Sequence, residues 1–84
     1  MENWKTYEPR FRYIMLSRMK SDCDYYLGNG NRYADHLWAG NEFNQIMNMK
    51  ALWEAFEPED SPEWLTKDEL KDYARQMGVD LNDW

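Results

Sequence analysis

The chain has 84 residues and a formal net charge of −6, and 43% of its residues are hydrophobic and 17% aromatic. This length predicts a single domain, residues 1–84, close to the size at which one hydrophobic core is sufficient, and the aromatic content excludes a disordered chain. The one cysteine excludes an internal disulfide, and because the longest aliphatic run is Ile14-Met15-Leu16 we expect neither a secretion signal nor a membrane-spanning segment.

Charge is distributed unevenly along the chain. Residues 1–36 contain six Lys and Arg against five Asp and Glu, a net charge of +1, whereas residues 37–84 contain four against eleven, a net charge of −7. Such a negative field repels a phosphate backbone, so we expect no direct binding of nucleic acid. It favours a basic protein partner, or a groove that normally holds nucleic acid. The alternative interpretation is a solvated acidic surface that keeps the protein soluble.

The first predicted helix runs from about residue 9 to residue 27. Its apolar residues recur every four positions, at Phe11, Met15, Met19 and Cys23, and Pro9 suits a first helical turn. A Gly-Asn-Gly-Asn turn at residues 28–31 then ends the helix, because glycine and asparagine tolerate left-handed backbone conformations. Residues 34–39 are predicted to form a short helical turn.

The second predicted helix begins at Asn41, a suitable N-cap, and ends at about Phe56. Its apolar face consists of Ile46, Met49, Trp53 and Phe56. The proline-containing segment 57–62 follows, and it separates the second helix from the third.

The third predicted helix has a capping box at its start. Thr66 is the N-cap and Glu69, three residues later, reaches back to it. Gly78 is well placed to end this helix, and residues 79–84 form a tail that Leu81 or Trp84 could attach to the core.

We therefore predict an all-α fold, a single small domain of three main helices, with the Gly-Asn-Gly-Asn turn and a short helical turn between the first two. No strand pattern competes with this interpretation. The predicted core consists of Met15, Leu16, Met19, Ile46, Met49, Trp53, Leu70 and Met77.

Several motifs, in order along the chain, resemble one family. They are Arg12–Met19, Ser21–Arg32, His36–Gly40, Gln45-Ile46, Met49–Leu52 and Pro62–Thr66. They are similar to the large polyvalent protein-associated domain of phages and conjugative elements, of the type with an Asp-Cys-x-Tyr-Tyr-Leu-Gly motif, over about residues 10–77. The resemblance implies a mobile-element protein in the cytoplasm of a bacterial host, and that family has no settled enzymatic activity to carry over. That family often appends the domain to long multidomain proteins, whereas this chain consists of little else, which favours an independent small effector.

The only cysteine and the only histidine are candidate zinc ligands. Cys23 and His36 are separated by twelve residues, a span found between ligand pairs in small zinc modules. The carboxylates that could add oxygen ligands are Asp22, Asp24, Asp35 and Glu42. The alternative is a buried structural cysteine with a capping or loop histidine, because Cys23 lies on the apolar face and free cysteine is commonly buried.

No catalytic residues are predicted. Cys23 lies near the C-terminal end of a helix, where the helix dipole disfavours a reactive thiolate. The turn at Gly28-Asn29-Gly30 follows a helix rather than a strand and has no P-loop lysine. We therefore expect a non-enzymatic protein, and a cysteine- or metal-dependent enzyme remains only as a remote alternative.

The chain has more aromatic residues than the core of a three-helix domain can hold, so we expect some of them to be surface anchors for a protein partner. The predicted contact patch is at the turn, where Tyr25 and Tyr33 flank the glycines and Trp38 follows. The acidic stretch of Glu57, Glu59, Asp60 and Glu63 is a second candidate partner-binding segment. The alternative is that edge aromatics merely close an undersized core.

Two functions are consistent with the sequence. The first is a binding protein that inhibits a host defence complex, such as an anti-CRISPR protein that blocks nucleic-acid loading of an RNA-guided Cas nuclease, because an acidic protein can occupy a basic nucleic-acid channel. The second is an accessory protein-interaction module of mobile-element proteins that has no inhibitory activity. Neither function requires a membrane.

Overall fold

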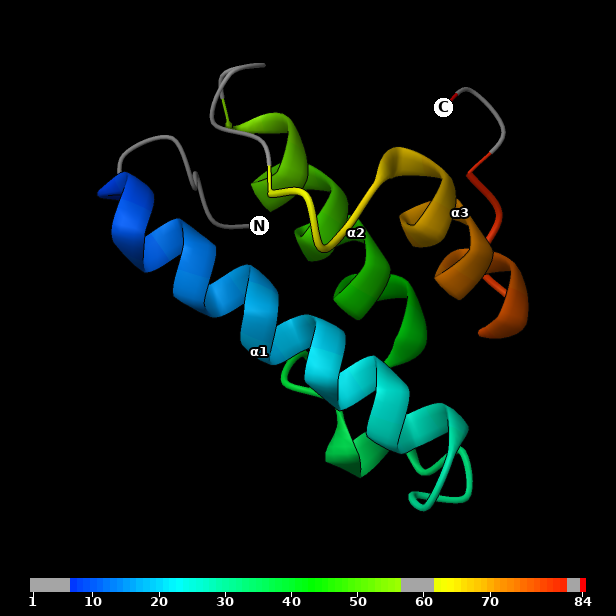
Figure 1. Ribbon diagram of the computed structural model, residues 1–84. Helices are drawn as coiled ribbons and strands as arrows, with labels where there is room; N and C mark the ends of the chain where they lie inside the picture. The colour runs from blue at the N-terminus through cyan, green and yellow to red at the C-terminus, as the bar shows by residue number, and fades with distance from the viewer. Residues whose placement is uncertain (1–6, 57–61, 82–83) are drawn as a thin grey trace.

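The fold is that of a computed structural model, which describes residues 7–56, 62–81 and 84 (Figure 1). The described residues form α1 (Pro9–Leu27), the short 3₁₀ helix η2 (Ala34–His36), α2 (Glu42–Glu54) and α3 (Lys67–Gln76). No strand occurs in this part of the chain, so the predicted all-α class is confirmed. Among the same residues, no helix is both long enough and apolar enough to cross a membrane.

The helices form a small bundle in which α2 packs against both α1 and α3 (Figure 1). The first two helices run in opposite directions, which brings the start of α1 to the end of α2. There the guanidinium of Arg12 donates a hydrogen bond to the carbonyl oxygen of Ala55 and lies 5.4 Å from the centre of the Phe56 ring. A cation is favourable at this end of α2 because the last carbonyl groups of a helix carry partial negative charge.

The core contains most of the residues that the sequence predicts, together with residues from the loops. Leu37 and Leu65 are buried although they lie outside the three main helices. Met15 and Trp53, which were predicted in the core, are only partly buried and pack at its edge. The buried hydrophobic residues are Leu16, Met19, Cys23, Tyr26, Leu37, Ile46, Met49, Leu52, Leu65, Leu70, Ala74, Met77 and Val79.

Phe11 differs from its predicted position on the apolar face of α1. Its side chain is 43% exposed, whereas Cys23, three steps of four residues along the same row, is fully buried. The reason is geometric: four residues exceed one 3.6-residue turn, so a row spaced by four drifts around the helix. The N-terminal end of this row therefore lies away from the core.

The helix ends follow from local sequence signals. Asn41 caps α2 by accepting a hydrogen bond from the amide of Asn44 at 2.8 Å, and both bonds of the predicted capping box between Thr66 and Glu69 are present. Gly78 has a positive φ of 76°. It lets the amide of the next residue, Val79, reach back to the carbonyl of Ala74 at 2.8 Å, which closes the end of α3.

The turn after α1 uses its glycines differently from what the sequence predicts. The left-handed residues are Asn31 and Arg32, with φ of 55° and 60°, rather than the two glycines. Gly30 is required for space, because a Cβ atom there would lie 2.8 Å from the carbonyl oxygen of Tyr25. The guanidinium of Arg32 donates to the carbonyl of Gln76 at 2.8 Å, which ties this turn to the end of α3.

The C-terminal tail is attached through Trp84. Its ring meets the ring of Trp53 edge to face, with centroids 5.4 Å apart. The ammonium groups of Lys50 and Lys67 lie 5.3 Å and 5.2 Å from the same ring. These contacts agree with the predicted attachment of the tail, which packs against Trp53 at the edge of the core.

Candidate functional site

One buried amide organises the region that the sequence singles out. The side chain of Gln45, in α2, is fully buried. Its amide nitrogen donates to the carbonyl of Met19 in α1 at 3.2 Å, and its amide oxygen accepts from the backbone of Ala39 at 3.0 Å. Gln45 therefore holds α1 and the segment that contains η2 against α2.

Cys23 belongs to this buried layer. Its side chain is fully buried, its Sγ lies 3.5 Å from the Sδ of Met49, and it also has a hydrogen bond with Gln45. Burial raises the pKa of the Cys23 thiol to about 12. The thiol is therefore protonated at neutral pH, which disfavours both nucleophilic attack and metal binding without a rearrangement.

Two of the other candidate zinc ligands, Asp22 and Asp24, have separate hydrogen-bond partners. Asp22 accepts a hydrogen bond from the backbone of Trp38 at 3.1 Å, and Asp24 accepts one from the hydroxyl of Tyr73. Asp35 is exposed in η2, and the side chain of His36 lies outside the described part of the structure. Within the described residues, no group of three or more His, Cys, Asp or Glu is placed to hold a metal ion. Zinc binding by Cys23 and His36 thus stays a prediction.

The start of α2 carries a polar contact that the sequence pattern does not reveal. The hydroxyl of Tyr26 donates to a carboxylate oxygen of Glu42 at 2.6 Å, and Tyr26 is almost fully buried. This hydrogen bond lowers the pKa of Glu42, whereas burial and the same carboxylate raise the pKa of Tyr26. Glu42, a predicted oxygen ligand, accepts this hydrogen bond, and its negative charge also suits the positive end of α2.

The predicted aromatic patch lies on the surface around the turn. Tyr25 is 48% exposed, Tyr33 63% and Trp38 39%. Two of these residues have contacts that hold them in place. The carboxylate of Asp22 accepts a hydrogen bond from the amide of Trp38, and Gly30 packs beside the ring of Tyr25. Phe43, at the start of α2, is 57% exposed and was missed, because its isolated position shows no pattern in the sequence.

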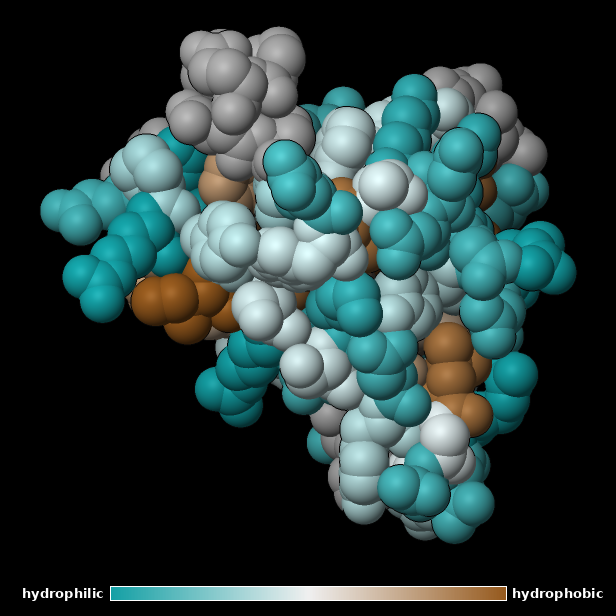
Figure 2. Space-filling model, in the orientation of Figure 1, coloured by the Kyte–Doolittle hydropathy of each residue, from teal (hydrophilic) through white to brown (hydrophobic). Residues whose placement is uncertain are grey.

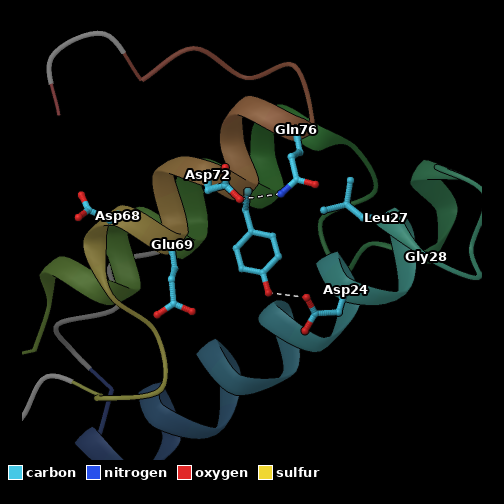
Figure 3. Close-up of a pocket in the computed structure, with 8 residues that line it drawn as sticks. Asp24, Leu27, Gly28, Asp68, Glu69, Asp72 and Gln76 are labelled. Atoms are coloured by element: carbon cyan, nitrogen blue, oxygen red, sulfur yellow. Dashed lines mark hydrogen bonds between the residues drawn. The ribbon is translucent and has the colours of Figure 1, made fainter.

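The predicted acidic stretch is only partly described. Glu63 is exposed, whereas Glu57, Glu59 and Asp60 lie outside the described residues. The structure places other carboxylates together, in an open groove of about 620 Å³ between the end of α1 and α3 (Figure 3). Its acidic residues are Asp24, Asp68, Glu69 and Asp72.

The acidic groove is organised by hydrogen bonds. The hydroxyl of Tyr73 donates to Asp24 across the groove, and the amide of Gln76 donates to Asp72 at 2.8 Å (Figure 3). Partial burial, and then the bond to Asp24, raise the pKa of Tyr73 well above its usual range. The groove was missed from the sequence because Asp24 and Tyr73 are far apart in the chain.

The burial of Cys23 gives a testable prediction, which also distinguishes a buried structural cysteine from a zinc ligand. At pH 8, an alkylating reagent should modify Cys23 slowly in the folded protein and rapidly in urea. Because the folded pKa is raised, the stability from the protonated thiol is fully present below the ordinary thiol pKa of 9.0 and is lost as pH rises towards about 12. In Cys23→Ala, the free energy of unfolding should therefore fall less steeply between about pH 9 and pH 12 than in the unaltered protein.

Metal analysis completes that experiment. A zinc site would instead give about one zinc ion per chain in protein purified without added metal, loss of the ion in Cys23→Ser and in His36→Ala, and a lower melting temperature after chelation. Rapid alkylation of the folded, metal-free protein would contradict a buried thiol.

Comparison with known proteins identifies the family of this chain. The model of a family described as large polyvalent protein-associated domain 11 matches residues 9–77, a range that extends from the first residue of α1 to the residue after α3. No curated protein and no solved structure matches the chain. Since the match includes all of the described helices, the chain belongs to the large polyvalent protein-associated domain 11 family.

Proposed function

We propose that this domain is a non-enzymatic protein-interaction module of mobile-element proteins. The observation that carries the proposal is the amount of large hydrophobic surface that the fold leaves exposed. Among the residues that the structure describes, seven such side chains are at least 39% exposed although the domain has a well-formed core: Phe11, Tyr13, Ile14, Tyr25, Tyr33, Trp38 and Phe43.

Their chemistry supports binding to protein rather than a purely structural role. Tyrosine, tryptophan and phenylalanine are enriched in protein interfaces, and they provide much of the binding energy when a partner covers them. Tyr33 and Phe43 are more than half exposed, so they contribute little to closing the core. The family name supports the same function, because it describes a domain associated with large polyvalent proteins.

The chemistry of the polar groups also favours a binding role. The only thiol is buried and protonated at neutral pH. In the acidic groove, Asp24 and Asp72 accept hydrogen bonds from neighbouring side chains. Neither arrangement provides an activated nucleophile or an acid and base pair next to a substrate cavity.

Inhibition of a host defence complex is the second candidate, and the charge distribution favours it. Residues 37–84 have a net charge of −7, and the acidic groove adds a local concentration of carboxylates. RNA-guided nucleases hold nucleic acid in a positively charged channel. An acidic domain could compete with nucleic acid for such a channel, as a small anti-CRISPR protein would.

Capture of a partner tests the first proposal. The tagged chain, expressed in a bacterial host that carries the mobile element, should retain at least one protein that mass spectrometry identifies. A Tyr33→Ala/Trp38→Ala variant should lose that protein, because it removes two exposed anchors. Lys71→Ala, which alters an exposed position on α3, is the matched control and should retain the partner. If the unaltered chain captures no specific protein, the proposed function is wrong.

A cleavage assay with a purified RNA-guided nuclease tests the second candidate. The chain should slow DNA loading, and its association rate should fall as salt rises, because long-range attraction is screened. Reversal of Glu57, Glu59, Asp60 and Glu63 to lysine should weaken inhibition, whereas Tyr25→Ala should raise the dissociation rate with little dependence on salt. Full inhibition by the charge-reversed protein would show that the acidic stretch is only a solubilising surface.

A further inference from the structure

We infer that the outer side of α1 is a docking surface for an acidic amphipathic helix of a protein partner. This inference rests on the proposed function and deepens it, because it names the surface and the chemistry of the partner. The surface, here called the α1 stripe, consists of Phe11, Ile14, Arg18, Ser21 and Tyr25.

The α1 stripe is defined by helical spacing. Its members follow one another at intervals of three or four residues, so they share one side of the helix. The residues of α1 that enter the core, namely Leu16, Met19, Cys23 and Tyr26, occupy the opposite side. The stripe is thus a second apolar face on a helix whose first face is already used.

The apolar members of the stripe are well exposed. Ile14 is 54% exposed, Tyr25 48% and Phe11 43%. In Figure 2, strongly hydrophobic surface lies beside hydrophilic surface over the N-terminal half of α1, at the left of the view. An exposed isoleucine between aromatic residues gives a partner apolar area to cover, and this area lies on a rigid element.

Two arginines, Arg18 in the α1 stripe and Arg10 beside it, give this surface a preference for a negatively charged partner. Arg10, Ile14 and Arg18 follow one another at intervals of four residues, so Ile14 lies between two cations on one helical row. Both arginines are exposed, and the ion pairs among the described residues involve other cations, namely Lys20, Lys50 and Arg75. Carboxylates on a partner would therefore complement Arg10 and Arg18 without displacing an existing ion pair.

The shape of the surface fits a helix. From Phe11 to Tyr25 the stripe extends over about 21 Å at 1.5 Å per residue, which a partner helix of about 15 residues would match. Ser17 and Ser21 are small and exposed, so a partner backbone can approach α1 closely between the larger side chains. Apolar residues of the partner would then pack beside Ile14, with acidic residues at the flanks.

Other occupants fit less well. In a two-fold pairing of α1 with a second copy, Arg18 lies near the middle of the stripe and would meet the same arginine of that copy, which is unfavourable. A nucleic acid or an anionic membrane would bring many phosphates towards a chain whose net charge is −6. A helix with a few carboxylates placed beside Arg10 and Arg18 avoids the pairing of like arginines, and it brings far fewer negative charges towards the chain than a phosphate backbone does.

Two designed peptides test this inference with the full chain. Each is an amphipathic helix of about 15 residues with the same leucine face, and they differ only in carrying Glu or Lys at the flanking positions. In an NMR titration, the Glu peptide should shift the amide resonances of the α1 stripe and bind about tenfold more tightly than the Lys peptide. Arg18→Glu should reverse this preference.

Matched substitutions locate the binding surface. Ile14→Ser should weaken binding of the Glu peptide about tenfold, whereas Asn44→Ser, at an exposed position on α2 outside the proposed binding residues, should change its dissociation constant by less than about twofold. Both side chains are exposed, so neither change should unfold the protein, and circular dichroism of each variant checks this.

Several results would overturn the inference. The first two are equal affinity for the two peptides and an Arg18→Glu variant that keeps the preference for the Glu peptide. The third is dimerisation of the chain that Ile14→Ser abolishes. The fourth is that the chain binds phosphatidylglycerol vesicles or duplex DNA through Arg18 and does not bind the peptide. Capture experiments separate this inference from the proposed function. If captured partners depend on Trp38 but not on Ile14, the domain binds protein through another surface and the α1 stripe is not the docking site.

Discussion

The arrangement of this domain depends on the side-chain amide of Gln45, which is the only fully buried polar side chain among the described residues. The amide nitrogen of Gln45 donates a hydrogen bond to the carbonyl of Met19 in α1, and its amide oxygen accepts one from the backbone amide of Ala39 after η2. A buried amide without partners would cost about 1–3 kcal/mol. This relative position of the three segments satisfies both ends of the Gln45 amide, so the side chain favours it over arrangements that would leave the amide unpaired.

The surface features follow from this position. With residues 37–39 held against α1, the amide of Trp38 reaches Asp22, and the exposed aromatics around the turn are fixed on ordered backbone. Cys23 is buried beside Met49 in the same layer, and this burial raises the pKa of its thiol. The side of α1 that faces away from this layer carries Ile14 and Arg18, and both side chains are exposed.

The sequence predicts well those features whose cause is local. The bounds of α1, the cap at Asn41 and the capping box at Thr66 depend on neighbouring residues, and each agrees with the structure. Features that depend on distant residues could not be read in this way. The hydrogen bonds between Tyr26 and Glu42 and between Asp24 and Tyr73 are examples.

The apolar surfaces of α1 were also predicted only in part. The sequence spacing puts Phe11 and Cys23 in one row of α1, but only the packing shows that Phe11 is exposed and Cys23 is buried. The exposed turn aromatics were predicted, but the α1 stripe was not, because two apolar faces on one helix look like a single broad face in the sequence.

The most direct test of the role of Gln45 is the free energy of unfolding of Gln45→Met, measured with urea together with hydrogen exchange of the Ala39 amide. Methionine has a similar volume but cannot satisfy Met19 and Ala39, so we expect a loss of about 1–3 kcal/mol and loss of protection at Ala39. Gln76→Met is the matched control, because Gln76 is exposed, and it should change stability by less than about 0.5 kcal/mol. Unchanged stability of Gln45→Met, with Ala39 still protected, would contradict the account.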